Sequence, residues 1–315
     1  MVKLSQTEKE LEKAARAKAR QKRGSLRHNQ VSESVLKRYV SAIAMLQAYW
    51  RAHDIDATLD DTFDFCIGEY IEHLYAEGEP KGYGTDVLAA IQYFIPKVTG
   101  KLKYSWKLLG IWKRLEPPNR ATPFTPIVVL GLAGLAASLK LYDVCALFLL
   151  GFDRFLRTGE LLNLRVFNIQ FGTSKAVITL HETKTGKRKG NTEMVSVTSP
   201  LVLRWLRKAC AGKKPEDLLL NQTYYQLRML FRQFLCHFDI DNLQYNLYSL
   251  RRGGCTSFFF ECGSLDLTVE VGRWSDSATA RIYIQNAAAE SAEISLSARQ
   301  SLMLQESAKA FKNCN

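Results

Sequence analysis

Two arginines lie in sequence contexts that suit the binding of a phosphate group. Arg157 belongs to "FLRTGELLNLRV" and Arg251 to "LYSLRRGGCTSFFF". Two guanidinium groups from distant parts of the chain could bind both non-bridging oxygens of one phosphate, with a structural ion pair as the alternative for each. A third stretch, "VGRWSDSATARIYIQN", carries Trp274, whose indole can only donate a hydrogen bond. It also carries Tyr283 on an expected helix. Tyr283 could take part in the chemistry, or it could simply pack in the hydrophobic core.

The expected helix over 249–262 gives Arg251 an unusual position. A step of 100° per residue puts Arg251 in the middle of an apolar arc formed by the cysteines and phenylalanines of this segment. A buried guanidinium is costly without an anion, so Arg251 implies a ligand or a carboxylate partner. Gly253 and Gly254 would let another backbone approach the helix closely. In the motif of Arg157, Glu160 could orient the Arg157 guanidinium or be an ordinary charge at a helix N-terminus.

Composition and charge favour a globular protein with a polyanionic partner. The 315 residues suffice for two domains, and 47% of them are hydrophobic. Lysine and arginine outnumber acidic residues by 43 to 31, and the net charge of +12 makes nucleic acid the leading partner. Seven cysteines without C-x-x-C pairs or zinc-ligand spacing indicate neither a disulfide framework nor a metal site, and they suggest a reducing, intracellular compartment.

No membrane or secretory segment is expected from the sequence. The first residues lack the apolar core of a signal peptide. The most apolar stretches, 127–139 and 144–152, are shorter than the ~20 residues that a transmembrane helix needs.

The elements that would position the motifs form two predicted domains. Nine basic side chains in residues 1–31 predict a solvated, flexible tail. Residues 32–116 are predicted to form a small all-helical domain, followed by a proline-rich linker over 117–126. The helices of this first domain are expected at 34–52, 61–76, 84–97 and 104–115.

The second domain is predicted to be mostly helical, so the fold class is mainly α with a small antiparallel β-sheet. The β-rich runs "KAVITLHET" and "NTEMVSV" flank "KTGKRKG", which predicts a β-hairpin with a basic tip. Helices are expected at 127–139, 142–155, 200–211, 223–237, 249–262 and from 276 to the end, with a break near Ala287.

In order and spacing, the motifs resemble those of the tyrosine recombinase (phage integrase) family. These motifs are an arginine in an R-x-x-E-L context, a lysine in a T-K-T hairpin, an H-x-L-R box, and a tryptophan followed nine residues later by a tyrosine. The resemblance implies a catalytic domain over 127–290, a core-binding (SAM-like) domain before it, and a C-terminal helix or tail over 291–315. The matching residues are Arg157, Lys184, Arg251, Trp274 and Tyr283.

The resemblance implies a site-specific recombinase or integrase that attacks DNA. Tyr283 would attack a phosphodiester and leave a 3′-phosphotyrosyl bond and a free 5′-hydroxyl, with no ATP, metal or other cofactor. Arg157 and Arg251 would neutralise the charge on the transferring phosphate. Trp274 would donate to a phosphate oxygen or support Tyr283. Lys184 is the expected general acid, because nearby arginines should lower its pKa.

One position departs from the family pattern. Tyr248 stands where the H-x-L-R box has histidine, and with a reference pKa near ~10 it can hydrogen-bond a phosphate but is a poor general base. This variant is similar to the recombinases of eukaryotic mobile elements. It also leaves open a domesticated protein that binds DNA without cutting it, and a type IB topoisomerase-like activity would share the same chemistry.

Double-stranded DNA is the expected partner, bound largely through backbone phosphates. The C-terminal segment 291–315 is expected to dock either on a neighbouring subunit of a tetramer on DNA or on its own core. The resemblance implies a nuclear protein in a eukaryote and a cytoplasmic one otherwise. Further DNA contacts are expected at the hairpin tip, where Lys187 is also the alternative general acid, and beside the catalytic motifs. The residues of these contacts are Lys187, Arg188, Lys189, Arg252 and Arg273.

Overall fold

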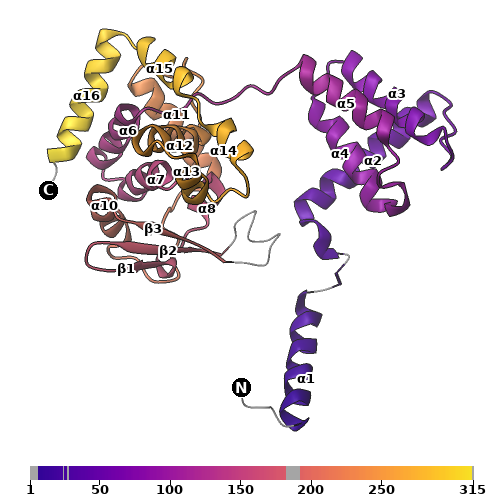
Figure 1. Cartoon of the computed structure of the whole chain (residues 1–315), viewed down its shortest axis with the longest axis horizontal. Helices are drawn as coiled ribbons and strands as arrows, with labels where there is room; N and C mark the ends of the chain where they lie inside the picture. Colours follow the sequence, from indigo (N-terminus) through magenta and orange to yellow (C-terminus); the bar gives the residue numbers. More distant parts are fainter. Residues whose placement is uncertain (1–5, 24, 27, 182–191, 314–315) are drawn as a thin grey trace. The chain divides into compact units, whose positions relative to one another are not determined.

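The computed structural model describes residues 6–23, 25–26, 28–181 and 192–313. The chain divides into two compact units, Met1–Asn119 and Arg120–Asn315 (Figure 1). The division falls inside the proline-rich segment, and each unit has its own hydrophobic core.

In the described part of the first unit, four helices share one core. Helix α2 packs against α4, and α3 packs against α5. The Asp64 carboxylate accepts hydrogen bonds from the backbone N–H groups of Tyr104 (2.7 Å) and Ser105 (3.0 Å), which ties the start of α5 to α3. The helices are α2 (Glu33–Ala52), α3 (Phe63–Ala76), α4 (Lys81–Phe94) and α5 (Lys103–Leu115).

A helix also forms where the sequence predicts a flexible tail. Helix α1 spans Gln6–Arg23, and its side chains from residue 10 to residue 22 are all exposed. Burial therefore does not explain this helix. Its composition does, because alanine, glutamate, glutamine, lysine and arginine are the strongest helix formers.

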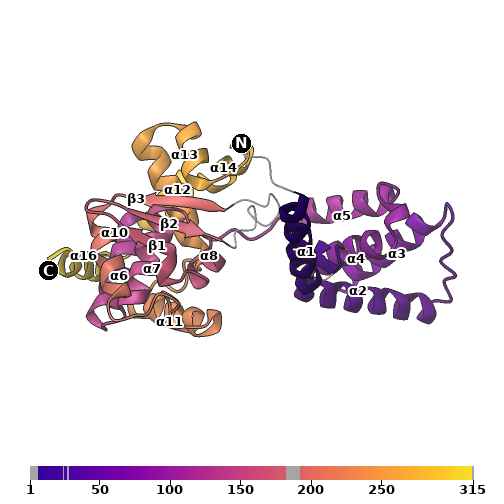
Figure 2. The ribbon, with the colours of Figure 1, turned by 90° about the horizontal axis from the view of Figure 1, so that it is seen from below.

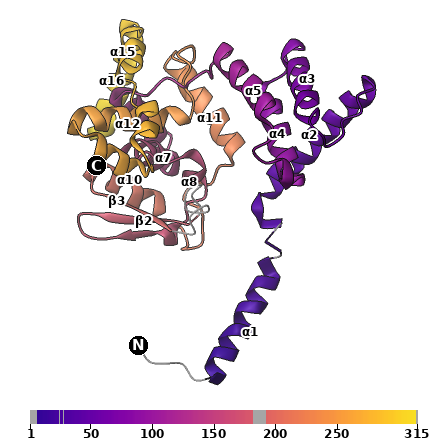
Figure 3. The same cartoon turned by 45° about the vertical axis from the view of Figure 1, so that its right-hand side comes forward.

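Helix α7 (Tyr142–Asp153) lies at the centre of the second unit. Most of its residues are buried, because α6 (Pro126–Ser138), α10 (Pro200–Cys210) and α12 (Tyr248–Cys262) pack against it (Figures 1 and 3). A helix that is apolar on all sides is expected in such a position. Among the described helices, none is long and apolar enough to cross a membrane.

A small antiparallel sheet lies at one side of this unit (Figure 1). The strands β1 (Ile169–Phe171), β2 (Ala176–Leu180) and β3 (Glu193–Val197) follow the order β1-β2-β3. Buried side chains alternate along β2, as expected when one sheet face covers a core. The predicted fold class, mainly α with a small antiparallel sheet, is confirmed.

Two glycines bring α12 close to its neighbours, as predicted. A Cβ atom on Gly253 would collide with the backbone of Phe124, and one on Gly254 would collide with the carbonyl group of Phe152. Helix α12 can therefore approach the end of α7 at backbone distance. This approach places Arg251 next to the carbonyl group of Phe155.

The C-terminal helix α16 (Ala298–Asn313) packs against α6 of its own unit (Figures 1 and 2). Leu304 and Phe311 are buried there, and the Ser307 hydroxyl donates to the Gly131 carbonyl oxygen at 2.9 Å. A side chain at Gly131 would collide with Leu304, so the small residue is needed for this contact. The structure thus has the docking on its own core, one of the two expected arrangements, while Ile294 and Leu302 of the same segment stay exposed. The predicted tetramer on DNA stays a prediction.

Several short elements were not predicted. They are the strand β1 and the helix α13 (Leu265–Gly272), each only a few residues long. The short helix α8 (Thr158–Leu162) begins where the sequence indicated a helix N-terminus, although no range was predicted for it. The C-terminal region breaks between α14 (Ser277–Tyr283) and α15 (Asn286–Ile294), and again before α16, rather than once near Ala287. Helix α11 (Tyr224–His237) was predicted.

Candidate active site

Arg251 is fully buried on α12 and is held by backbone carbonyl groups. Its guanidinium donates to the carbonyl oxygen of Phe155 and, through Nη2 at 2.9 Å, to that of Gly272. Phe155 itself has a left-handed backbone with φ of 49°, and so does Arg273, the residue after Gly272, with φ of 55°. Such a conformation is uncommon for residues other than glycine. Two unusual backbone turns therefore aim carbonyl groups at one guanidinium.

The charge of Arg251 has no carboxylate in ion-pair contact within the part of the chain that the structure describes. Its Nε atom is buried and, among the same residues, has no hydrogen-bond partner. Burial, followed by the nearby Arg157 charge, lowers the pKa of Arg251 to about 10, so the side chain is still protonated at neutral pH. A buried cation in this state is prepared for an anionic ligand.

Arg157 immediately precedes α8 and is oriented by Glu160. The Glu160 carboxylate accepts from the backbone N–H of Arg157 at 2.9 Å and from its Nη1 at 2.7 Å. About a quarter of the Arg157 side chain stays exposed. The guanidinium is therefore fixed in direction and still accessible, which is the arrangement that the sequence analysis expected of Glu160.

Glu160 also contacts Arg273, and this contact corrects one prediction. Arg273 Nη2 lies 2.6 Å from Glu160, and Arg273 Nε lies 3.0 Å from Glu193 on β3. Burial opposes the ionisation of Glu160, but the Arg273 charge and the hydrogen bonds from Arg157 outweigh it and lower the pKa of Glu160 below its usual value. Arg273 was predicted to contact DNA, whereas the structure places it between two carboxylates as part of an internal ion-pair network.

Tyr283 ends α14 and lies among the predicted catalytic residues. Its ring centroid is 4.7 Å from that of Trp274, and the Arg251 guanidinium carbon lies 4.8 Å from the Trp274 ring and 5.3 Å from the Tyr283 ring. The Tyr283 hydroxyl is hydrogen-bonded to the hydroxyl of Tyr248. The structure therefore brings together Arg157, Tyr248, Arg251, Trp274 and Tyr283.

The indole of Trp274 has a donor without an acceptor. Its Nε1 atom is buried and, among the described residues, no side-chain or backbone oxygen accepts its hydrogen. The ring is fixed between Phe155, at 6.4 Å between centroids, and Tyr283. An unsatisfied buried donor costs free energy, and a ligand oxygen is one way to satisfy it.

Arg252, which was predicted to contact DNA, is buried. Only 3% of Arg252 is exposed, and its Nη2 donates to the Ile282 carbonyl oxygen at 3.5 Å. The helical period of α12 alone suggests an exposed edge. The reason for the difference is α14, which covers that edge and was not placed by the sequence pattern.

The predicted hairpin residues lie outside the residues that the structure describes. They are Lys184, Lys187, Arg188 and Lys189. Their roles, including that of the general acid, stay predictions.

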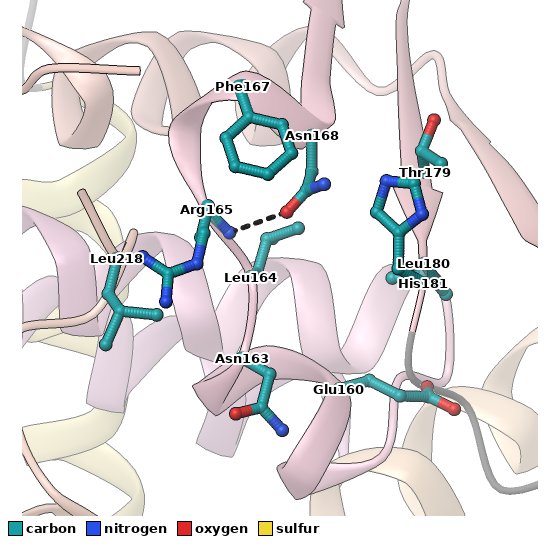
Figure 4. Close-up of a pocket in the computed structure, with 10 residues that line it drawn as sticks. All are labelled: Glu160, Asn163, Leu164, Arg165, Phe167, Asn168, Thr179, Leu180, His181 and Leu218. Atoms are coloured by element: carbon teal, nitrogen blue, oxygen red, sulfur yellow. Dashed lines mark hydrogen bonds between the residues drawn. The ribbon is translucent and has the colours of Figure 1, made fainter. Parts of the chain in front are cut away.

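Two cavities adjoin the cluster. One, of about 480 Å³, is lined by Glu160, Asn168 and His181 among others and lies beside the ion-pair network (Figure 4). The other, of about 900 Å³, runs along α11 and is lined by Arg228, Arg232, Thr158 and Tyr248 among others. The second cavity reaches the cluster at Tyr248, and the sequence analysis did not single out its two arginines. Their i, i+4 spacing on an amphipathic helix was the available signal.

Solved structures of tyrosine recombinases are similar to this chain. The integrase of the transposon Tn1549, in complex with transposon right end DNA, superposes with a TM-score of 0.60 at 12% identity, covering 88% of this chain and 96% of that chain. A lambda integrase dimer bound to a COC′ core site gives a TM-score of 0.54 at 12% identity, over 82% and 73% of the two chains. The XerH site-specific recombinase bound to its difH substrate gives 0.51 at 12% identity, over 82% and 78%.

The chain therefore has the tyrosine recombinase fold, as the motif resemblance predicts. No protein-family model matches the sequence, and no curated protein sequence does either. The structural likeness extends over most of this chain, including its first unit.

Proposed function

We propose that this chain is a site-specific DNA recombinase that breaks and rejoins strands through Tyr283. The observation that carries the proposal is the position of Tyr283, whose ring lies 5.3 Å from the guanidinium carbon of the buried Arg251. Arg251 has no carboxylate in ion-pair contact among the described residues. A nucleophile and an anion-binding group in one place are what phosphoryl transfer requires. The fold supports the same class of reaction.

The proposed step balances without any external energy source. The Tyr283 oxygen bonds to phosphorus while the bond between phosphorus and the 5′-oxygen breaks, which leaves a 3′-phosphotyrosyl ester and a 5′-hydroxyl. Arg157 and Arg251 stabilise the charge on the pentacoordinate phosphorus, and the unpaired indole N–H of Trp274 donates to a phosphate oxygen. Lys184, the predicted general acid, supplies the proton to the 5′-oxygen. Attack by a 5′-hydroxyl from another strand reverses the step.

Duplex DNA is the proposed substrate. The net charge of +12 favours a polyanion, and the three similar structures are all described as complexes with DNA. The cavity along α11 brings the exposed Arg228 and Arg232 next to Tyr248, where they are able to contact the phosphates that flank a bound scissile phosphate. A role in the movement of a mobile element belongs to the same proposal.

The test is covalent capture on nicked suicide duplexes made from the DNA that flanks the gene. After cleavage, a short 5′-hydroxyl fragment diffuses away, so the 3′-phosphotyrosyl adduct accumulates. We expect an adduct that survives denaturing electrophoresis, that forms in the presence of EDTA, and that is lost in Tyr283→Phe. Tyr142→Phe, on a half-buried tyrosine of α7 whose ring packs against Trp205 at 6.0 Å between centroids, is the matched control for loss of a hydroxyl.

Two other functions are outcomes of the same experiment. Binding of the duplex without any adduct would identify a DNA-binding protein that has lost catalysis, for which Tyr248 in place of histidine is the sequence argument. Adduct formation with relaxation of supercoiled plasmid, but without strand exchange between two duplexes, would identify a topoisomerase-like enzyme.

A further inference from the structure

The contact between Tyr248 and Tyr283 is fixed by elements of the fold. Tyr248 is the first residue of α12 and Tyr283 the last residue of α14, and their ring centroids lie 5.7 Å apart. The Thr256 hydroxyl, also on α12, donates to the Tyr283 carbonyl oxygen at 3.1 Å and accepts from the Gln285 N–H at 3.2 Å. Helix α14 therefore ends at a defined place on α12, with the two hydroxyl groups in hydrogen-bond contact.

The surroundings of the two hydroxyl groups differ in charge. The Arg251 guanidinium carbon lies 5.3 Å from the Tyr283 ring. Burial opposes ionisation of Tyr283, but the hydrogen bond with Tyr248 and the charges of Arg251 and Arg157 outweigh it and lower the pKa of Tyr283. Burial and the same hydrogen bond raise the pKa of Tyr248 to about 12. Tyr283 thus loses its proton first, and Tyr248 keeps its own.

Other charged groups around the pair come from several elements. Arg252, on α12, lies beside both Tyr248 and Tyr283. The charge of Arg120, in the segment before α6, acts on Arg252 and helps to lower its pKa. Glu160 and Arg273 form the ion-pair network behind Arg251. Most of these groups are positive, so they favour a negative charge on the Tyr283 oxygen, as Arg251 and Arg157 do.

We propose that Tyr248 is a positioning residue whose hydroxyl donates a hydrogen bond to the Tyr283 oxygen and holds it, as the nucleophile, beside the phosphate site. The inference rests on the proposed function. Tyr283 gives its proton to solvent and its oxygen forms the bond to phosphorus while the 5′-oxygen leaves. Tyr248 keeps its proton throughout. In the rejoining step, the Tyr283 oxygen leaves phosphorus as a phenolate, and the same hydrogen bond from Tyr248 stabilises it.

This role differs from general base catalysis by the histidine of the H-x-L-R box. A tyrosine that keeps its proton cannot accept one from the nucleophile, whereas it can stabilise the charge that the nucleophile acquires. The substitution of histidine by Tyr248 then preserves activity by a hydrogen bond rather than by proton transfer. Catalysis in this site therefore requires that Tyr283 be ionised before or during the attack.

The first test is the pH profile of single-turnover cleavage. In Tyr248→Phe, the midpoint of the rise in rate with pH should move upward by about one pH unit, and the rate at neutral pH should fall about tenfold, because one hydrogen bond to a charged oxygen is lost. The cleavage rates of the wild type and of Tyr248→Phe should converge at high pH. Tyr245→Phe is the matched control, since Tyr245 is a buried tyrosine three residues away whose hydroxyl has no partner among the described residues. An unchanged profile in Tyr248→Phe, or a loss that is equal at every pH, would overturn the inference.

The second test does not require cleavage and separates the inference from the proposed function. Spectrophotometric titration of the tyrosines in the full chain without DNA should show one group that ionises at lower pH than the rest. This group should disappear in Tyr283→Phe and move to higher pH in Tyr248→Phe, with no change in Tyr245→Phe. If the titration behaves in this way but no adduct forms, the proposed function fails and the hydrogen bond stands. If Tyr248→Phe leaves the titration unchanged, the inference fails even when adducts form.

Discussion

Two arginine sites within the same unit have opposite electrostatic surroundings. Arg273 lies between Glu160 and Glu193, so carboxylates neutralise its charge. Arg251 is more deeply buried, hydrogen-bonds the backbone carbonyl groups of Phe155 and Gly272, and has no carboxylate in ion-pair contact among the described residues. A guanidinium that is paired with two carboxylates holds structure together, and most of its attraction for a substrate anion is compensated. A buried guanidinium without a carboxylate retains its attraction for an anion. The comparison therefore assigns Arg273 to the scaffold and Arg251 to the reaction.

The largest effect that this comparison predicts is on cleavage in Arg251→Ala. Loss of a preorganised cation at the phosphate should lower the single-turnover cleavage rate by about 10³-fold, as for the loss of a strong oxyanion donor. Arg273→Ala should lower the cleavage rate less and the free energy of unfolding more. Measurement of the cleavage rate and of the free energy of unfolding for both variants checks this assignment of the two arginines. Equal cleavage rates in Arg251→Ala and Arg273→Ala would contradict it.

The next effect is on stability in Glu160→Gln. Removal of one partner of a buried ion pair should cost about 3 kcal/mol in the free energy of unfolding at neutral pH. Because the pKa of Glu160 is lowered in the folded chain, its stabilisation is present above the unfolded value of ~4.3 and is lost as the pH falls through the folded value. Denaturant unfolding should thus show wild type and variant converging in acid. A stability difference that is constant with pH would mean that the Glu160 charge is not responsible.

The smallest effect concerns the unpaired indole donor. Trp274→Phe retains an aromatic ring against Tyr283 and removes only the N–H, so the cleavage rate should fall about tenfold with little change in stability. Trp205→Phe offers a matched control, because Trp205 Nε1 is likewise buried and without a partner among the described residues but lies in the core against α16. If both variants cleave at the wild-type rate, the Trp274 N–H does not contact the phosphate.

Local sequence patterns predicted the main helices and the buried position of Arg251. The burial itself does not follow the predicted arc: residues 249–256 are buried consecutively, whereas Phe258 and Phe259 are half-buried and Cys262 is exposed. The glycine pair predicted the close backbone approach for a similarly local reason. The tyrosine recombinase fold followed from the order of the motifs along the chain.

Contacts between distant segments could not be predicted in this way. The pairing of Arg273 with Glu193 depends on the position of β3, and the burial of Arg252 depends on the placement of α14 over α12. The hydrogen bond between Tyr248 and Tyr283 likewise joins two helices whose relative position no sequence period records. Short elements such as α8 and α13 carry too few residues for a periodic pattern.

The most direct test of the account is the identification of the residue that becomes linked to DNA. The adduct formed on a nicked suicide duplex would be digested with trypsin and nuclease, and the modified peptide sequenced by mass spectrometry. The account predicts a single phosphotyrosyl linkage at Tyr283 and no adduct in Tyr283→Phe. A linkage at any other residue, or an undiminished adduct in Tyr283→Phe, would contradict it.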